Sequence, residues 1–261
     1  MKKNCLNKIT RKTMLYKTGV EYGDYTANYI LGCAHGCQYP CYAFCMAKRF
    51  GTAKTYDDWI NPSIVSNTLQ LLDKELPKLK NDIKNVHLCF TTDPFMYEYE
   101  DVKQLSLEVI KKINSYGLPC SILTKGILPE ELSNYNIYSK ENMYGITLVS
   151  LDENFKSQYE PNAASLEDRI KALKYLHDSG CKTWVSIEPY PTPNIINQDL
   201  LEILNRINFV DKIIFGRLHY NKLVSEYKEH KKYYNDLAHI VIEYCKKNKI
   251  DCHIKNKTIT H

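Results

Sequence analysis

Short apolar runs alternate with amphipathic segments along most of the chain. The apolar runs are rich in strand-forming residues and occupy positions 86–90, 120–123, 145–149, 183–187 and 212–215. Around them, apolar residues recur at helical spacing, which predicts helices at 63–79, 102–116, 166–179, 199–207 and 233–247. Strands and helices that alternate at this pitch indicate βαβ units around a parallel sheet.

The order of the elements predicts one α/β domain. A strand at 27–31 and a helix at 42–50 bring the number of βα units to six. Ser165 and Asp168 form a capping pattern before the helix at 166–179, and Gly180 follows that helix. No linker, low-complexity tract or strong repeat divides the chain, so we expect a single domain over residues 1–261. Periodicity alone does not distinguish a partial barrel from a doubly wound sheet.

Four cysteines recur at every fourth position within residues 32–51, namely Cys33, Cys37, Cys41 and Cys45. Such spacing would suit one face of a helix, but Gly36 and Pro40 disfavour a helix over the first three cysteines. Residues 33–41 are therefore expected to form a loop that brings its thiols together. A helix then starts after Pro40 and ends near Gly51.

Clustered thiols in one loop indicate a metal centre more than a set of buried apolar cysteines. Structural zinc sites usually contain paired cysteines, and the chain has no C-x2-C pair. Iron–sulfur clusters are held by closely spaced thiolates of the kind seen here. Three cysteine ligands would leave one iron of a cubane cluster without a protein ligand, and that iron is where chemistry could occur.

The cysteine loop resembles that of radical S-adenosylmethionine (SAM) enzymes, and within them the branch related to spore photoproduct lyase, also described as DNA repair photolyase-like. The superfamily spacing is C-x3-C-x2-C with an aromatic residue before the last cysteine. This chain has C-x3-C-x3-C, in which Pro40 follows Tyr39. The resemblance extends over roughly residues 27–218. It implies a partial (β/α)6 TIM-like barrel with parallel strands, open on one side, followed by a C-terminal helix and tail at about 219–261.

The resemblance also implies the cofactors and their contacts. Cys33, Cys37 and Cys41 would each bind one iron of a 4Fe–4S cluster, and the amine and carboxylate of SAM would chelate the fourth iron. Polar residues follow the predicted strands, and active sites of α/β barrels gather at the carboxyl ends of strands. The expected SAM-binding residues are Tyr39, Thr92, Asp93, Lys125, Ser150 and Glu188. Glu160 and Arg169 match the same branch, although a loop contact and a helix salt bridge explain them equally well. No catalytic side chain is assigned.

The resemblance implies an enzyme that reductively cleaves SAM to a 5′-deoxyadenosyl radical, which abstracts hydrogen from a substrate. An electron donor such as flavodoxin or ferredoxin would be its partner. The alternative is a non-catalytic iron–sulfur protein, acting as an electron carrier, redox sensor or nucleic-acid binder, in which Cys45 supplies a fourth ligand. The sequence does not identify the substrate, the donor or the oligomeric state.

Repair of a thymine photoproduct is the less favoured substrate hypothesis. Spore photoproduct lyases have the pattern Cys-Thr-Ser-Asp after the second strand, whereas this chain has Phe90-Thr91-Thr92-Asp93. Cys89 is one residue too early, and strand alternation predicts that it faces away from the pocket.

Composition adds limits on partners and location. The chain has 35 basic and 30 acidic residues, and this net charge of +5 permits a nucleic-acid partner without favouring one. The 21 tyrosines accompany abundant Lys, Asn and Ile, which indicates a general bias of composition. Residues 1–15 lack the apolar core of a secretory signal, and no run approaches the roughly 18 apolar residues of a membrane span. Ten cysteines without export features predict a reducing, cytoplasmic location and no membrane partner.

Overall fold

An eight-stranded sheet forms the core of the protein, whose computed structural model describes residues 6–260. Its strand order is β11-β10-β9-β8-β7-β6-β3-β2, and all neighbouring pairs are parallel except β2 and β3. The strands are β2 (Leu15–Lys17), β3 (Tyr25–Ala27), β6 (Val86–Leu88), β7 (Cys120–Thr124), β8 (Met143–Thr147), β9 (Lys182–Tyr190), β10 (Lys212–Arg217) and β11 (Asp251–Ile254). The edge strands β2 and β11 do not pair with each other, so the predicted open α/β barrel is confirmed.

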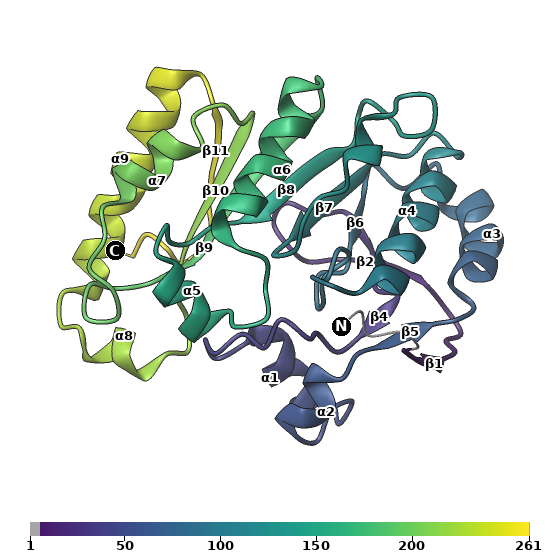
Figure 1. Ribbon diagram of the computed structural model, residues 1–261, viewed down its shortest axis with the longest axis horizontal. Coiled ribbons are helices and arrows are strands. Elements are labelled where there is room, and N and C mark those ends of the chain that lie inside the picture. Colours follow the sequence, from purple (N-terminus) through teal and green to yellow (C-terminus); the bar gives the residue numbers. More distant parts are fainter. Residues whose placement is uncertain (1–5, 261) are drawn as a thin grey trace.

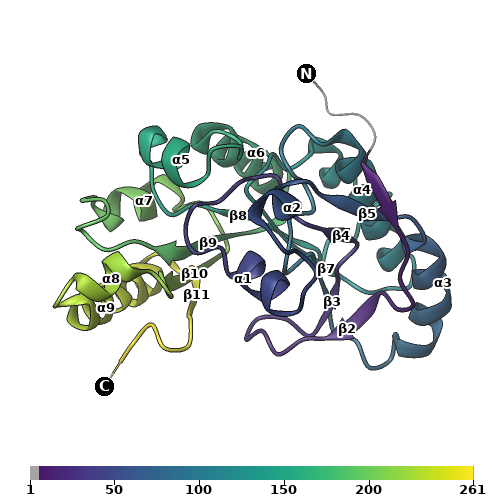
Figure 2. The ribbon, with the colours of Figure 1, turned by 90° about the horizontal axis from the view of Figure 1, so that it is seen from below.

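Five helices lie around the outside of the sheet, as expected for βαβ units (Figures 1 and 2). They are α3 (Thr68–Leu79), α4 (Glu100–Asn114), α6 (Leu166–Asp178), α7 (Leu200–Arg206) and α9 (His230–Asn248). The predicted cap of α6 is present, because the Ser165 hydroxyl accepts a hydrogen bond from the Asp168 backbone amide at 3.1 Å. In residues 6–260, no helix combines the length and apolar character needed to cross a membrane.

Shorter elements surround the segment that carries the cysteines. A small second sheet has the order β1-β5-β4, and Figure 2 shows α1 and α2 in front of the middle of the molecule. These elements are β1 (Asn7–Ile9), β4 (Ile30–Leu31), β5 (Ser63–Val65), α1 (Tyr42–Arg49), α2 (Tyr56–Ile60), α5 (Glu153–Tyr159), α8 (Lys222–Glu226) and a 3-10 turn, η1 (Glu130–Ser133).

Three element boundaries predicted from the sequence are wrong. The helix expected at 63–79 begins only at Thr68, because Ser63–Val65 pairs with β1 and β4 as strand β5. The strand expected at 27–31 is divided between β3, in the barrel, and β4, in the small sheet. The expected C-terminal tail contains β11, a seventh parallel strand that pairs with β10. In each case pairing with a distant strand decides the outcome, and local periodicity does not report such pairing.

The turn between β2 and β3 crosses the open side of the barrel. The ring of Tyr22 lies 5.8 Å from that of Phe90 and 6.2 Å from that of His253 on β11. The Glu21 carboxylate accepts hydrogen bonds from His253 Nε2 at 2.9 Å and from the Asn256 backbone amide at 3.0 Å. Lys255 Nζ lies 3.3 Å from the same carboxylate. The beginning and the end of the described chain are therefore linked across the opening.

Aromatic side chains fill the barrel interior beneath this turn. The ring centroids of His87 on β6 and Trp184 on β9 are 6.3 Å apart, although β7 and β8 separate these strands. Three strand spacings amount to about 14 Å, so the two rings can meet only across the concave face of the sheet. Trp184 is 2% exposed and covers Gly145 on β8, where an added Cβ would lie 2.4 Å from the indole Cε2.

Gly145→Ala should therefore destabilise the fold, because the methyl group would collide with a buried indole that has little room to move. Overpacking of this kind typically costs about 1–3 kcal/mol. The free energy of unfolding, measured by urea denaturation, tests this expectation. Gly19→Ala is the matched control, since nothing lies within 4 Å of an added Cβ there. Equal urea midpoints for the two variants would contradict the packing argument.

Candidate functional site

The cysteine loop, residues 33–41, is fixed by backbone hydrogen bonds from two sides. The Cys33 amide donates to the Trp59 carbonyl at 2.8 Å, and the Gln38 amide donates to the Tyr159 carbonyl at 2.8 Å. Asn162 Nδ2 donates to the Ala34 carbonyl at 3.0 Å. These contacts join the loop to α2 on one side and to the end of α5 on the other.

Gly36 permits the turn between the first two cysteines. Its φ of +67° is a conformation that side chains with a Cβ rarely adopt. An added Cβ would also lie 3.0 Å from Asn162 Nδ2. The loop therefore depends on glycine for both its backbone conformation and its close approach to the segment after α5.

The thiols of Cys33, Cys37 and Cys41 are half-buried and close enough to influence one another. Burial raises the pKa of all three thiols, that of Cys37 to about 12, and the neighbouring thiols contribute in the same direction. Cys45 lies one turn further along α1, where its amide donates to the Cys41 carbonyl at 2.9 Å, and its side chain is exposed. Cys45 therefore differs from the other three cysteines in its exposure, although its thiol also raises the pKa of Cys41.

Among residues 6–260, no group of three or more His, Cys, Asp or Glu side chains is arranged to hold a metal ion. Iron–sulfur clusters are held by cysteine thiolates, and Cys33, Cys37 and Cys41 are the thiols of one loop that could supply them. The raised pKa values describe the metal-free thiols, and binding iron would require their deprotonation.

His35, between the first two cysteines, contacts the segment that follows β6. It is 1% exposed, and its Nε2 accepts a hydrogen bond from the Tyr97 amide at 2.9 Å. Its Nδ1 lies 3.4 Å from Asp93 Oδ2. Burial lowers the pKa of His35 to about 4, so the ring is neutral at pH 7. The Nε2 contact places the single ring proton on Nδ1, facing Asp93.

Asp93 uses both carboxylate oxygens inside the protein. Oδ1 accepts from the Thr124 hydroxyl at 2.6 Å and from the Phe95 amide at 2.9 Å, and Oδ2 accepts from the Lys125 amide at 2.8 Å. The buried carboxylate therefore connects the ends of β6 and β7 with His35 of the cysteine loop. Thr92 differs, because its Oγ1 is buried and has no hydrogen-bond partner in the described part of the chain.

Glu160 joins three of the sequence-predicted residues. Its Oε2 lies 2.7 Å from Arg169 Nη1, and its Oε1 lies 3.7 Å from Lys125 Nζ. The Tyr39 hydroxyl donates to the same Oε1 at 3.2 Å. Glu160 is 2% exposed and Arg169 is 0% exposed, so this ion pair is buried, and Asp93 is a second buried carboxylate whose charge also acts on Lys125.

The charges in this cluster are maintained by their neighbours. Burial by itself would raise the pKa of Glu160, but Lys125 and Arg169 lower it overall. Burial would likewise lower the pKa of Lys125, whereas Glu160 and other nearby anions raise it overall. Arg169 Nη2 is buried and has no hydrogen-bond partner in residues 6–260. Glu160 is thus held between two cations beside the cysteine loop.

Ser150 and Glu188 belong to other parts of the same rim. Ser150 is 1% exposed and its Oγ accepts from the Asp152 amide at 3.0 Å, which leaves the hydroxyl proton free to be donated. The Glu188 side chain covers Gly216, where an added Cβ would lie 2.9 Å from the carboxylate carbon. Burial raises the pKa of Glu188, and Lys255 and Lys125 oppose that shift.

Phe90 lies inside the barrel and Cys89 lies outside it, as the sequence predicts, but for a different reason. The Phe90 ring stacks on His87 at 3.8 Å within the interior aromatic group. The Cys89 thiol lies beside the hydroxyl of Tyr29, which donates at 2.8 Å to Ser106 of α4. Since His87 faces inward, regular alternation would also have turned residue 89 inward. The φ of +58° at Cys89 interrupts the alternation and reverses both side chains.

Several residues at the site are not distinguishable in the sequence. His35 could have been noticed only from its place between two cysteines, and nothing local marks Asn162 or Tyr97 as contacts of the loop. Glu21 and Tyr22 lie in a polar lead-in whose partners are more than sixty residues away. These residues act through pairs distant in sequence, and local patterns carry no information about such pairs.

An open barrel of parallel strands and helices, with a loop of three cysteines beside it, defines an α/β protein of the TIM-like barrel class. Comparison with protein families gives the particular family: the model of the Radical SAM superfamily matches residues 28–207. The chain belongs to the radical SAM superfamily. The cofactors of that superfamily are a 4Fe–4S cluster and SAM, which confirms both predicted cofactors. Superfamily members are enzymes.

Two curated relatives have no described function. An uncharacterized protein of Methanocaldococcus jannaschii is 29% identical over 196 residues, covering 74% of this chain and 70% of that protein. An uncharacterized protein of Acidianus two-tailed virus is 26% identical over 223 residues, covering 81% of this chain and 73% of that protein.

Solved structures show a shared fold. Spore photoproduct lyase, as a variant with bound AdoMet and dinucleoside spore photoproduct, has a TM-score of 0.69 and 13% identity, with 95% of this chain and 80% of that chain covered. SuiB of Streptococcus suis bound to S-adenosylmethionine has a TM-score of 0.53 and 15% identity, with 71% of this chain and 41% of that chain covered. These likenesses confirm the predicted resemblance at the level of fold.

Single replacements of Cys33, Cys37 or Cys41 by alanine should each abolish the brown absorbance of the reconstituted cluster or the cleavage of SAM. The reason is that each thiol would be the only protein ligand of one iron. Cys45→Ala should spare both properties, because that side chain is exposed one helical turn away. Iron content, visible spectra and 5′-deoxyadenosine formation are the measurements. A loss in Cys45→Ala equal to that in Cys37→Ala would refute this ligand set.

Proposed function

We propose that the protein is a radical SAM enzyme that reductively cleaves SAM and abstracts hydrogen from a substrate. The observation that carries this proposal is a loop of three half-buried cysteines beside the buried Glu160–Arg169 pair and the Lys125 ammonium, at the rim of an open barrel. Membership of the superfamily supports it. When bound, the cluster and SAM together supply a 5′-deoxyadenosyl radical, which is the hydrogen-abstracting species.

The residues around the loop have distinct parts in this proposal. Lys125 would hold the carboxylate of SAM by a charge-assisted hydrogen bond. Ser150 has a free hydroxyl proton with which to donate to a carboxylate or a ribose oxygen. The unpartnered Thr92 Oγ1 could accept from the amine. Glu188, on the β9 side of the rim, would face the adenosine or the substrate, and Asp93 would keep these groups in place.

The site also has the means to limit contact with water. Residues 33–41 are covered by α2 and by the segment after α5 through the backbone contacts described above. Below the rim, Phe90, Tyr22 and Trp184 close the barrel interior. A radical formed at the rim would thus be shielded from water. A substrate bound beside the rim would then be its nearest source of hydrogen.

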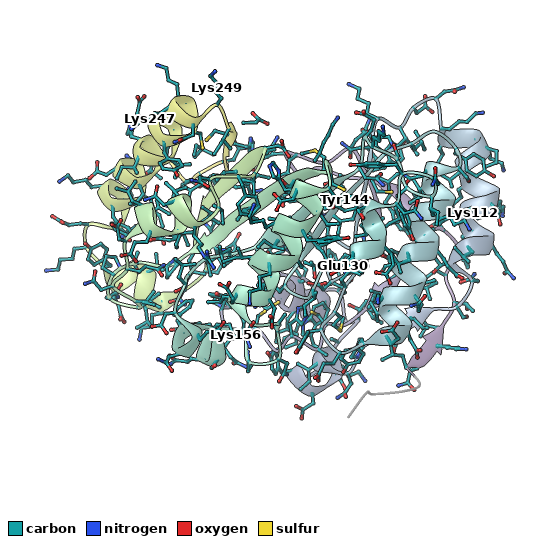
Figure 3. All side chains as sticks on the ribbon, turned by 45° about the horizontal axis from the view of Figure 1, so that its top comes forward. Lys112, Glu130, Tyr144, Lys156, Lys247 and Lys249 are labelled. Atoms are coloured by element: carbon teal, nitrogen blue, oxygen red, sulfur yellow. The ribbon has the colours of Figure 1, made fainter. Side chains whose placement is uncertain are left out.

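We also propose that this substrate is not a thymine photoproduct. Phe90 occupies the interior position where the resemblance places a cysteine, and its ring has no hydrogen of suitable bond strength to return to a product radical. The net charge of +5 does not favour a nucleic-acid partner either, and of the lysines labelled in Figure 3, Lys247 and Lys249 lie together at the end of α9, whereas Lys112 and Lys156 lie elsewhere. A small electron donor such as flavodoxin or ferredoxin in a reducing, cytoplasmic setting would complete the system.

Reduction of the reconstituted protein under anaerobic conditions should convert SAM to methionine and 5′-deoxyadenosine, but should not release thymine from spore photoproduct. The test is incubation with dinucleotide and duplex substrates, followed by chromatography. Lack of SAM cleavage by a fully loaded cluster would favour the non-catalytic iron–sulfur alternative. Stoichiometric thymine release, abolished by Cys89→Ala, would overturn the argument from the position of Phe90.

Lys125→Ala should weaken SAM binding about tenfold or more while leaving the cluster intact, because it removes a cation but no iron ligand. Hydrogen bonds to charged groups contribute about 1.5–3 kcal/mol. The dissociation constant for SAM, measured anaerobically on protein of known iron content, tests this role. Lys171→Ala, at a lysine of α6 that is 68% exposed, is the matched control. Equal affinity in both variants would show that Lys125 does not contact the cofactor.

A further inference from the structure

Lys125 can serve SAM only if its charge is not already neutralised by the protein. The carboxylate nearest to it in the described chain is Glu160, whose Oε1 lies 3.7 Å from Lys125 Nζ. Without other charges, Glu160 would compete with the carboxylate of SAM for the same ammonium group. A buried site enlarges this competition, because charges act more strongly at low dielectric than in water.

Arg169 removes that competition by binding the other carboxylate oxygen of Glu160. Its Nη1 lies 2.7 Å from Glu160 Oε2, a distance a full ångström shorter than that between Lys125 and Oε1. The guanidinium is held by the backbone as well, since Nε donates to the Ala164 carbonyl at 3.0 Å and Nη1 donates to the Thr147 carbonyl at 3.1 Å. Arg169 therefore takes most of the negative charge of Glu160 and is itself unable to move away.

Glu160 also connects Lys125 with the cysteine loop. The oxygen that faces Lys125 is the one that accepts from the Tyr39 hydroxyl at 3.2 Å. The Tyr39 ring lies 5.4 Å from that of Tyr159 at the end of α5, and Glu160 is the residue that caps this helix. The Ala164 amide donates to the Lys125 carbonyl at 3.0 Å. One carboxylate oxygen thus fixes the lysine relative to the loop that carries the thiols.

We propose that Glu160 and Arg169 are positioning residues for SAM: Glu160 holds Lys125 beside the cysteine loop, and Arg169 neutralises Glu160 so that the charge of Lys125 remains available to the cofactor carboxylate. Neither residue needs to touch SAM. This inference rests on the proposed function, because it takes Lys125 as the carboxylate ligand. It assigns a role to a charge pair that could otherwise be explained as a structural salt bridge.

Three variants distinguish an electrostatic role of the Glu160–Arg169 pair from a purely structural role. Arg169→Gln keeps a hydrogen-bond donor but leaves the negative charge of Glu160 facing Lys125. Arg169→Lys keeps the positive charge and loses the forked geometry. The double variant Glu160→Gln/Arg169→Gln removes both charges, and its residue 160 can still accept from the Tyr39 hydroxyl. Glu167→Gln, at an exposed α6 carboxylate paired with Arg206, is the control for loss of an acidic group.

The readout is the dissociation constant for SAM, obtained from the change that SAM causes in the electron paramagnetic resonance spectrum of the reduced cluster. Arg169→Gln should weaken binding about tenfold or more. Arg169→Lys and Glu167→Gln should bind within about threefold of the wild type, and the double variant should regain part of the loss, because it removes the charge that opposes SAM but also the anion that holds Lys125. Recovery of SAM affinity in the double variant at an unchanged melting temperature relative to Arg169→Gln is the distinguishing result, because a purely structural pair would lose and regain affinity together with stability.

Unchanged affinity in folded, cluster-loaded Arg169→Gln would overturn the inference and leave the proposed function intact. If that variant does not fold, Arg169→Lys and the double variant decide, and a tenfold loss in both would overturn the inference. Absence of SAM binding in the wild-type protein would overturn the proposed function and this inference together. Thermal denaturation of each variant separates a loss of stability, which a buried pair is expected to show, from a loss of affinity.

Discussion

The candidate site depends on one buried carboxylate, that of Asp93. Three donors hydrogen-bond to its two oxygens, the His35 ring lies 3.4 Å away, and the side chain is almost wholly removed from water. A buried carboxylate is stable only when its oxygens accept hydrogen bonds, so Asp93 restrains the position of each donor. The strand ends of β6 and β7 and the cysteine loop are thereby fixed relative to one another. The same hydrogen bonds position Lys125, because its backbone amide is one of the donors.

A second buried carboxylate, that of Glu160, is also held by several partners, but these are two charged side chains and a tyrosine hydroxyl in place of backbone amides. Asp93 holds backbone, whereas Glu160 holds the ends of long side chains. The two groups lie on either side of Lys125, one bound to its amide and the other near its ammonium. The lysine is thus constrained at both ends, which is how a flexible four-carbon side chain can present a charge at a defined place.

The sequence predicts well those features that depend on neighbours in the chain. The alternation of strands and helices predicted parallel βαβ units, the resemblance of the cysteine loop implied the open barrel, and the glycines and proline of that loop excluded a continuous helix. It predicts poorly whatever depends on distant partners: β5 has an apolar pattern that also suits a helix, and β11 becomes a strand because β10 offers it an edge. The inward position of Phe90 follows from a single positive φ at Cys89, which no residue pattern announces. Likewise, Glu160 and Arg169 are adjacent only because α6 returns its first turns to the end of α5.

The bridge across the open side of the barrel has a consequence for how the chain is made. Glu21 meets His253 and Lys255, residues more than 230 positions later in the chain. During synthesis the early turn therefore waits for its partners until residues 253–255 have been made, at rates of roughly 5–20 residues per second. The cysteine loop at residues 33–41 is made in the same early portion of the chain, so its synthesis precedes the formation of this bridge. Closure of the open side is thus a late event for one of the earliest segments of the barrel.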